Sequence, residues 1–224
     1  MHDKAVLLAT GRDADIFDLG DGTVLRRSRR GNSLEHEAHV MSFARARGFP
    51  VPEVLGLRDD SRSLIMEKVD GPSMLAAMLM DSDVTSHAAV LADLHLRLHD
   101  LPSPAWVRRG PGPDNDRLVH LDLHPLNVIQ SERGPVVIDW ANAARGTGAS
   151  DVALTWTILA TAQPSLDAQL KQDFDALRSS FIEEFLAHFE RSALTSVLGD
   201  VIEWRLADLN VSTQERVALV ALLD

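Results

Sequence analysis

The sequence predicts an α+β protein with a small antiparallel β-sheet at its N-terminal end and a larger helical part after it. Up to about residue 70, short apolar runs alternate with turns rich in glycine and aspartate, which is typical of strands joined by tight connections. After residue 70, apolar residues recur at the spacing of amphipathic helices. We therefore predict two domains, residues 1–70 and residues 71–224.

The first domain is expected to contain five strands and one helix. The runs predicted as strands are Ala5–Ala9, Ile16–Leu19, Thr23–Arg27, Val54–Leu57 and Ser63–Lys68. Gly20-Asp21-Gly22 lies between the second and third runs and suits a hairpin turn. Leu34–Arg47 has helical spacing, and Gly48 and Pro50 end it. The predicted order is three strands, one helix and two strands.

The second domain is expected to be mostly helical. Its predicted helices begin with Ser73–Met80 and Val84–His99 and resume at Asp151, after which the whole sequence has a helical pattern. Two short strands are expected at Val128–Gln130 and Val136–Ile138. The breaks expected between the last helices lie near Pro164, Gly199 and Asn210–Thr213.

Net charge restricts the classes of function. The formal net charge is −11, from 33 acidic and 22 basic residues. This argues against a nucleic-acid binder, because such proteins use Lys and Arg to neutralise phosphates. From residue 151 onward there are twelve acidic and five basic residues, so seven of the eleven net negative charges lie there. That bias favours either a solvated helical surface or an acidic wall that attracts a cationic substrate.

Composition also bears on the compartment. The sequence contains no cysteine, which excludes disulfides and thiolate metal sites. The longest apolar run, residues 152–162, is far shorter than the ~20 residues needed to span a bilayer. The apolar stretch near the N-terminus is too short for the core of a signal peptide. We expect a cytoplasmic protein that binds neither membrane nor nucleic acid, and the sequence does not indicate its oligomeric state.

The segment from residue 120 to residue 140 carries the residues suited to chemistry. It reads His-Leu-Asp-Leu-His-Pro-Leu-Asn from 120 to 127 and Val-Val-Ile-Asp-Trp from 136 to 140. A proline-containing loop separates Asp122 from Asn127, and Asp139 ends an apolar strand. Phosphoryl transfer needs such a set, namely a carboxylate that orients the attacking hydroxyl and oxygen ligands for Mg²⁺ on the nucleotide phosphates.

The order His-x-Asp-x-x-x-x-Asn, followed by an apolar strand ending in Ile-Asp-Trp, resembles the aminoglycoside phosphotransferase and choline-kinase-like family of small-molecule kinases. These enzymes are relatives of the protein kinases, so the resemblance implies a bilobal protein-kinase-like fold. It also implies that Asp122 is the catalytic base and that Asn127 and Asp139 hold Mg²⁺. The residues implied to support the loop are His120, His124 and Asp151.

Weaker similarity extends through the N-terminal part. Leu64–Gly71 resembles the strand and hinge that join the two lobes of these kinases. The residues implied to surround the nucleotide base are Met66, behind it, and the backbone of Glu67 and Val69. Arg26 stands in place of the usual phosphate-binding lysine, and alternation along its strand favours it over Arg27. Glu37, in the following helix, is its expected ionic partner.

The chain departs from the family pattern at three positions. Arg26 replaces a lysine, which keeps the positive charge but changes its reach and geometry. Leu121 and Leu126 stand where the family often has glycine, which narrows the loop without removing a reacting group.

The resemblance therefore implies a kinase that transfers the γ-phosphate of Mg²⁺-bound ATP or GTP to a hydroxyl of a small molecule. An aminoglycoside-like or amino-alcohol acceptor is expected from the acidic C-terminal third. Two other interpretations stay open. A nucleotide-binding pseudokinase with a regulatory role would share the fold. A zinc-dependent hydrolase would draw its ligands from His95, His99, His120, Asp122 and His124.

Overall fold

The computed structural model describes residues 5–113, 116–162, 168–208 and 210–223. The chain divides into two compact units. The first comprises the described residues up to Pro72 together with Val128–Asn142. The second comprises Ser73–Asn127 and the described residues from Ala143 onward. Each unit is considered separately below.

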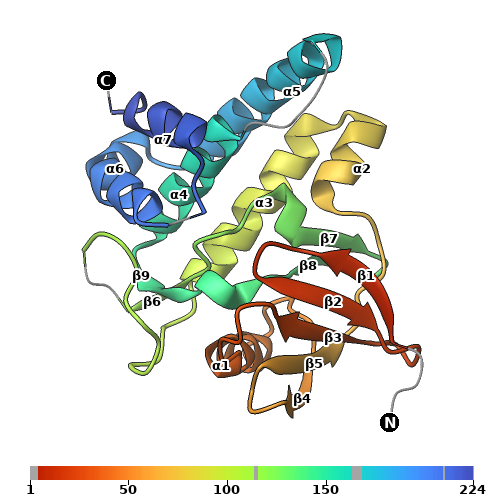
Figure 1. Ribbon diagram of the computed structural model, residues 1–224. Helices are drawn as coiled ribbons and strands as arrows, with labels where there is room; N and C mark the ends of the chain where they lie inside the picture. Colours follow the sequence, from red (N-terminus) through yellow and green to blue (C-terminus); the bar gives the residue numbers. More distant parts are fainter. Residues whose placement is uncertain (1–4, 114–115, 163–167, 209, 224) are drawn as a thin grey trace. The chain divides into compact units, whose positions relative to one another are not determined.

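The first unit is built on a five-stranded antiparallel sheet, drawn in red to orange in Figure 1. Its strands are β1 (Val6–Thr10), β2 (Ala14–Asp18), β3 (Thr23–Ser28), β4 (Val54–Arg58) and β5 (Ser63–Glu67). Their order across the sheet is β1-β2-β3-β5-β4. Helix α1 (Glu35–Arg45) lies between β3 and β4 in the chain. The predicted order of three strands, one helix and two strands is confirmed.

Alternation along β3 decides which side chains face the interior of this unit. Val24 and Arg26 are buried, whereas Arg27 between Arg26 and the strand end is exposed. This is the two-residue period of a strand with one covered face. The helix α1 buries Ala38, Val40, Met41 and Ala44, and ends just before Gly48, whose φ of 80° belongs to the left-handed region.

A β-hairpin from later in the chain completes the first unit. It consists of β7 (Val128–Ser131) and β8 (Gly134–Val137), and the short 3-10 helix η2 (Trp140–Asn142) follows it. The backbone N–H of Gln130 donates to the carbonyl of Pro72 at 2.8 Å. A side chain at Gly71 would collide with the carbonyl of Gln130, so the close approach requires glycine. The sequence pattern predicted these two strands but did not place them in the first unit, because they lie far from the N-terminal sheet in the chain.

The second unit is mainly helical. Its helices are α2 (Met74–Asp81), α3 (Val84–His99), α4 (Gly148–Thr161), α5 (Ala168–Leu186), α6 (Arg191–Leu206) and α7 (Thr213–Val220). The remaining elements are β6 (Arg117–Val119), the 3-10 helix η1 (Pro125–Asn127) and β9 (Ala144–Gly146), which pairs with β6. Polar side chains begin several helices, as at α4, where Thr147 Oγ1 accepts from the backbone N–H of Ser150 at 3.1 Å.

The predicted breaks among the last helices have different outcomes. The break at 210–213 is confirmed, because α6 ends at Leu206 and α7 begins at Thr213. The break near Gly199 was wrong, because α6 runs through this residue. A glycine inside a helix costs only about 1 kcal/mol relative to alanine, which the apolar packing of α6 offsets. Pro164 lies outside the described residues.

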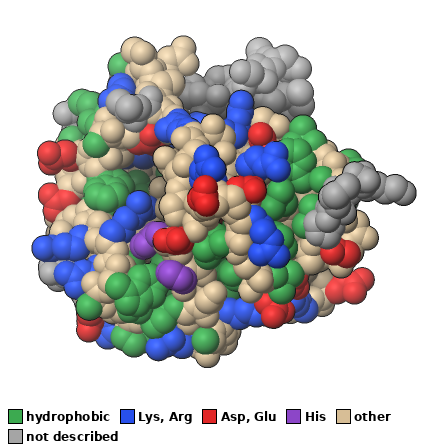
Figure 2. Space-filling view, turned by 60° about the horizontal axis from the view of Figure 1, so that its bottom comes forward, with side chains coloured by type: hydrophobic (Ala, Val, Ile, Leu, Met, Phe, Trp, Pro, Cys, Tyr) green, Lys and Arg blue, Asp and Glu red, His purple; other side chains and the backbone are tan. Residues whose placement is uncertain are grey.

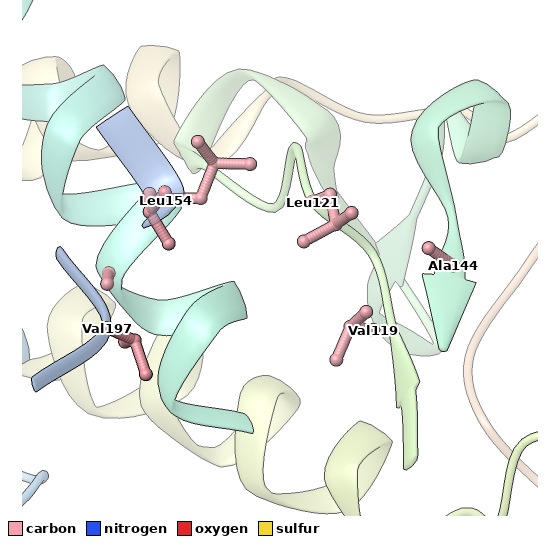
Figure 3. Packing of buried hydrophobic residues seen from close by; sticks show 7 residues of the cluster. Val119, Leu121, Ala144, Leu154 and Val197 are labelled. Atoms are coloured by element: carbon pink, nitrogen blue, oxygen red, sulfur yellow. The ribbon is translucent and has the colours of Figure 1, made fainter. Parts of the chain in front are cut away.

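A buried apolar cluster fixes the strand that leads into the segment from residue 120 (Figure 3). Val119 and Leu121 project from that strand and the loop after it, and Leu154 faces them from α4. Val197 of α6 and Ala144 of β9 belong to the same cluster. The loop is therefore attached to the core of the second unit by the residues on its N-terminal side.

Charges of both signs are interspersed on the face shown in Figure 2, so that face is not a surface of a single sign. No helix within the described ranges is both long and apolar enough to cross a membrane.

Candidate active site

Asp122 lies in the second unit, in the loop between β6 and η1, and two neighbours in the sequence contact it. Asn127 Nδ2 donates to Oδ2 of Asp122 at 3.1 Å and to its backbone carbonyl at 2.8 Å. His124 Nε2 lies 3.4 Å from the other carboxylate oxygen. The 3-10 turn at η1 brings Asn127 back over the loop. Asp122 and Asn127, which their spacing predicted to point at one spot, thus lie in contact, and so does His124, which the family resemblance implied to support the loop.

The environment of Asp122 favours its ionised form. Burial disfavours the charge, but hydrogen bonding to His124 and the positive potential of His124 and His120 outweigh burial, so the pKa of Asp122 lies below its ordinary value. An ionised carboxylate can accept a hydrogen bond from a hydroxyl group. That is the property required of a group that orients an alcohol for attack.

The buried carboxylate of Asp151, near the start of α4, holds the loop from behind. It accepts hydrogen bonds from the backbone N–H of His120 at 3.1 Å and from that of Leu121 at 2.7 Å. Its Oδ2 also lies 3.0 Å from Nε2 of His99. Burial opposes its charge, but the hydrogen bond with His99 and the nearby histidines keep the pKa of Asp151 well below its usual range. A side chain at Gly148 would collide with the ring of His99, so glycine allows α4 to approach α3 closely.

Leu121 occupies a strained backbone conformation. Its φ is 60°, in the left-handed region that favours glycine. Its side chain is 2% exposed and belongs to the apolar cluster of Figure 3. Burial and the two backbone bonds to Asp151 together offset a cost of about 1–2 kcal/mol. Leu126, the other departure from glycine, is largely exposed.

In the first unit, Arg26 joins two carboxylates. Its Nε lies 3.1 Å from Glu37 of α1, and its Nη2 lies 2.8 Å from Asp139, directly after β8. The expected ion pair of Arg26 with Glu37 is therefore present. Asp139 has a φ of 60°, and its carboxylate is partly exposed. Non-glycine residues in such conformations are found preferentially at functional sites.

The two carboxylates around Arg26 differ in environment. Burial raises the pKa of Glu37 to about 7, against the opposing effects of Arg26 and of the backbone N–H of Trp140. The pKa of Arg26 is raised, because the attraction of Glu37 and Asp139 outweighs its burial. The guanidinium therefore remains a cation, and Glu37 holds it through Nε.

The hinge residues also lie in the first unit. Met66 is in β5, where it pairs with Val24 of β3 and Val54 of β4. The backbone N–H of Glu67 donates to the carbonyl of Glu53 at 2.8 Å, so this N–H is not available to a base. Among the described residues, no hydrogen-bond partner contacts the backbone N–H of Val69.

Two oxygen atoms at these positions suit a hard cation. Among the described residues, the side-chain hydrogen bonds of Asn127 all use Nδ2, and the ion pair of Asp139 uses Oδ1. In the described part of the chain, Oδ1 of Asn127 and Oδ2 of Asp139 are therefore the atoms that remain for a metal ion. Carboxylate and amide oxygens are what Mg²⁺ prefers. Because these two residues belong to different units, their sharing of one ion stays a prediction.

The histidines considered as zinc ligands have other partners. His99 contacts Asp151, and His95 contacts Thr155 and the carbonyl of Leu91. Within the described ranges, no three His, Cys, Asp or Glu residues form a group that could hold a metal ion. The i, i+4 spacing of His95 and His99 was the signal for this arrangement, and it indicated packing of α3 on α4.

Several solved structures are similar to this chain. APH(2'')-IIa in complex with gentamicin has a TM-score of 0.63 at 16% identity, covering 99% of this chain and 91% of that one. ADP-bound aminoglycoside phosphotransferase APH(2'')-Ib has a TM-score of 0.61 at 14% identity, covering 99% and 92%. Ethanolamine kinase from Plasmodium vivax has a TM-score of 0.61 at 11% identity, covering 97% and 80%. These likenesses confirm the predicted fold. No curated protein matches the chain significantly by sequence.

The sequence itself carries the family assignment. A model described as the phosphotransferase enzyme family matches residues 4–113 and 105–185, which is most of the chain. The expected relation to the aminoglycoside phosphotransferases is confirmed by this match together with the fold. The chain belongs to the phosphotransferase enzyme family.

Proposed function

We propose that this phosphotransferase is a small-molecule kinase that moves the γ-phosphate of a Mg²⁺-bound nucleoside triphosphate to a hydroxyl group of its acceptor. The observation that carries the proposal is the ionised carboxylate of Asp122, which Asn127 and His124 contact in one short loop. A carboxylate with this charge accepts a hydrogen bond from the attacking hydroxyl, and an adjacent amide oxygen is a ligand for the metal.

The roles of the residues follow from their chemistry. Asp122 orients the acceptor hydroxyl and receives its proton as the new bond to phosphorus forms. Asn127 and Asp139 hold Mg²⁺, which neutralises negative charge on the nucleotide phosphates. Arg26, kept in place by Glu37 and Asp139, contacts the phosphates through Nη1, the guanidinium nitrogen that binds neither carboxylate. Most of the acceleration would come from positioning and charge neutralisation.

ATP is the first nucleotide to test, because similar structures hold ADP or ATP. GTP remains the alternative, since the backbone groups that would contact the base are the carbonyl of Glu67 and the N–H of Val69. A carbonyl and an N–H at a hinge can pair with either purine through different edges. The choice between them therefore requires binding measurements.

An amino-bearing alcohol is the proposed class of acceptor. Twelve acidic and five basic residues lie from residue 151 onward, and a negative potential of this kind concentrates cations near a site. The similar structures include a gentamicin complex and an ethanolamine kinase, and both compounds carry amino and hydroxyl groups. An aminoglycoside-like acceptor and a small amino alcohol are the two groups to screen.

The experiment has two stages. Thermal unfolding is first followed with ATP and with GTP, each with and without Mg²⁺. A nucleotide present at 100 times its dissociation constant adds about 2.7 kcal/mol to the stability of the native state, which is readily measured as a raised midpoint. Acceptor alcohols are then screened by release of the nucleoside diphosphate. The proposal fails if neither nucleotide produces a Mg²⁺-dependent shift.

A nucleotide-binding regulatory module with little turnover is the second candidate. The observation that favours it is the engagement of Arg26, which replaces a lysine and has both Nε and Nη2 on carboxylates. The same two-stage experiment separates the candidates. A Mg²⁺-dependent shift without diphosphate release for any acceptor supports the module, whereas release that depends on an acceptor supports the kinase.

A further inference from the structure

Helix α4 contacts the loop of residues 120–127, called the catalytic loop below, on both sides of Asp122. On the N-terminal side, Asp151 accepts the backbone N–H of Leu121. On the C-terminal side, one turn further along α4, Thr155 Oγ1 donates to the backbone carbonyl of Leu123 at 2.8 Å. Thr155 is 1% exposed, and Leu123 is fully buried. Leu121 and Leu123, the two residues that flank Asp122, are thus each held by a polar side chain of the same helix.

The hydroxyl of Thr155 has a second partner, His95 of α3. His95 Nε2 lies 3.1 Å from Thr155 Oγ1, and His95 Nδ1 lies 2.9 Å from the carbonyl of Leu91. The ring is fully buried. It packs against Phe185 at 5.2 Å and Phe189 at 6.2 Å between ring centroids. These contacts leave the imidazole no room to turn away from Thr155.

The protons that His95 and Thr155 can donate are fewer than the contacts that these two side chains make. Burial lowers the pKa of His95 to about 4, so the ring is neutral near pH 7 and carries one N–H. The hydroxyl of Thr155 supplies one more proton, which makes two protons for three close contacts. If the ring proton is on Nε2, His95 donates to Thr155 and the hydroxyl donates to Leu123, but Nδ1 then turns a lone pair to the carbonyl of Leu91. If the ring proton is on Nδ1, His95 donates to the carbonyl of Leu91, and the one hydroxyl proton of Thr155 serves both Nε2 of His95 and the carbonyl of Leu123.

We propose that Thr155, packed against the buried ring of His95, is a positioning residue for phosphoryl transfer, because its hydroxyl holds the carbonyl of Leu123. The inference rests on the proposed function, because it assumes that the carboxylate of Asp122 acts on the acceptor. The restraint fixes Leu123, the residue that follows Asp122, and thereby limits the direction of the Asp122 carboxylate. A small displacement of a reacting group lowers the rate without abolishing nucleotide binding.

The test compares three variants of α4. Thr155→Val removes the hydroxyl at nearly constant volume, and Thr155→Ser restores it. Thr157→Val is the matched control, because Thr157 is equally buried but its hydroxyl donates to the carbonyl of Leu154 in its own helix. One hydrogen bond of ordinary strength corresponds to roughly tenfold in rate. We expect Thr155→Val to lower kcat by about that factor with an unchanged KM for the nucleotide, Thr155→Ser to recover most of it, and Thr157→Val to keep the parent kcat.

Equal kcat values for Thr155→Val and Thr157→Val would overturn the inference, and so would a loss that Thr155→Ser does not recover. A parent protein without turnover refutes the proposed function and the inference together. Turnover in the parent that Asp122→Asn abolishes and Thr155→Val leaves intact refutes the inference alone.

Discussion

Asp151 offers the sharpest test of how the catalytic loop is held. In Asp151→Asn one acceptor oxygen becomes an NH₂ group at an unchanged shape. If this group replaces Oδ2, it faces the backbone N–H of His120, and if it replaces Oδ1, it faces that of Leu121. One buried N–H therefore loses its acceptor, which costs about 1–3 kcal/mol. The remaining bonds also lose their charge assistance, so we expect a total loss of about 2–5 kcal/mol in the free energy of unfolding.

The assay is urea denaturation at pH 7, followed by a series at falling pH. Because the folded pKa of Asp151 is depressed, its stabilisation is complete above the pKa of an unfolded aspartate, about 4, and is lost as pH falls toward the folded value. The difference between Asp151→Asn and the parent should therefore shrink only below about pH 4. Asp93→Asn is the control, since Asp93 is exposed and pairs only with Arg97 at 3.5 Å. A loss at Asp151 as small as that at Asp93 would refute the reasoning.

Two further changes probe the two units separately. Burial raises the pKa of Glu37 from 4.5 to about 7, so its contribution to stability is present below pH 4.5 and is lost as pH rises through 7. The difference corresponds to about 3 kcal/mol. Glu37→Gln should reduce the pH dependence of the free energy of unfolding between pH 5 and pH 8, measured by urea denaturation. An unchanged pH dependence would contradict this. Leu121→Ala should cost about 2–5 kcal/mol, whereas Leu126→Ala, at an exposed position in the same loop, should cost less than about 0.5 kcal/mol. Similar costs for both leucines, measured by thermal unfolding, would show that the apolar cluster does not anchor the loop.

The fold and much of the candidate site were predictable because their signals are local. Period-two alternation placed Arg26 rather than Arg27 on the buried face of β3, and the spacing of Asp122 and Asn127 predicted that they lie together in the loop. Turn residues also fixed the ends of α1 and the gap between α6 and α7.

The missed features depend on contacts between residues distant in sequence. The hairpin of β7 and β8 belongs to the first unit through backbone hydrogen bonds to Pro72 and Pro50 that no local pattern encodes. The partners of His95 and His99 come from α4, some 50 to 60 positions away, so their i, i+4 spacing showed only that they share a face of α3. The expected break at Gly199 failed because tertiary packing overrides a weak helix propensity.

The central claim is that Asp122 acts in phosphoryl transfer and does not bind the nucleotide. Its most direct test measures the Mg²⁺-dependent thermal shift and the acceptor-dependent release of nucleoside diphosphate for the parent and for Asp122→Asn. The account predicts equal shifts for the two proteins, and diphosphate release from the parent only. Release that persists in Asp122→Asn, or a shift that disappears together with release, would contradict the role assigned to this carboxylate.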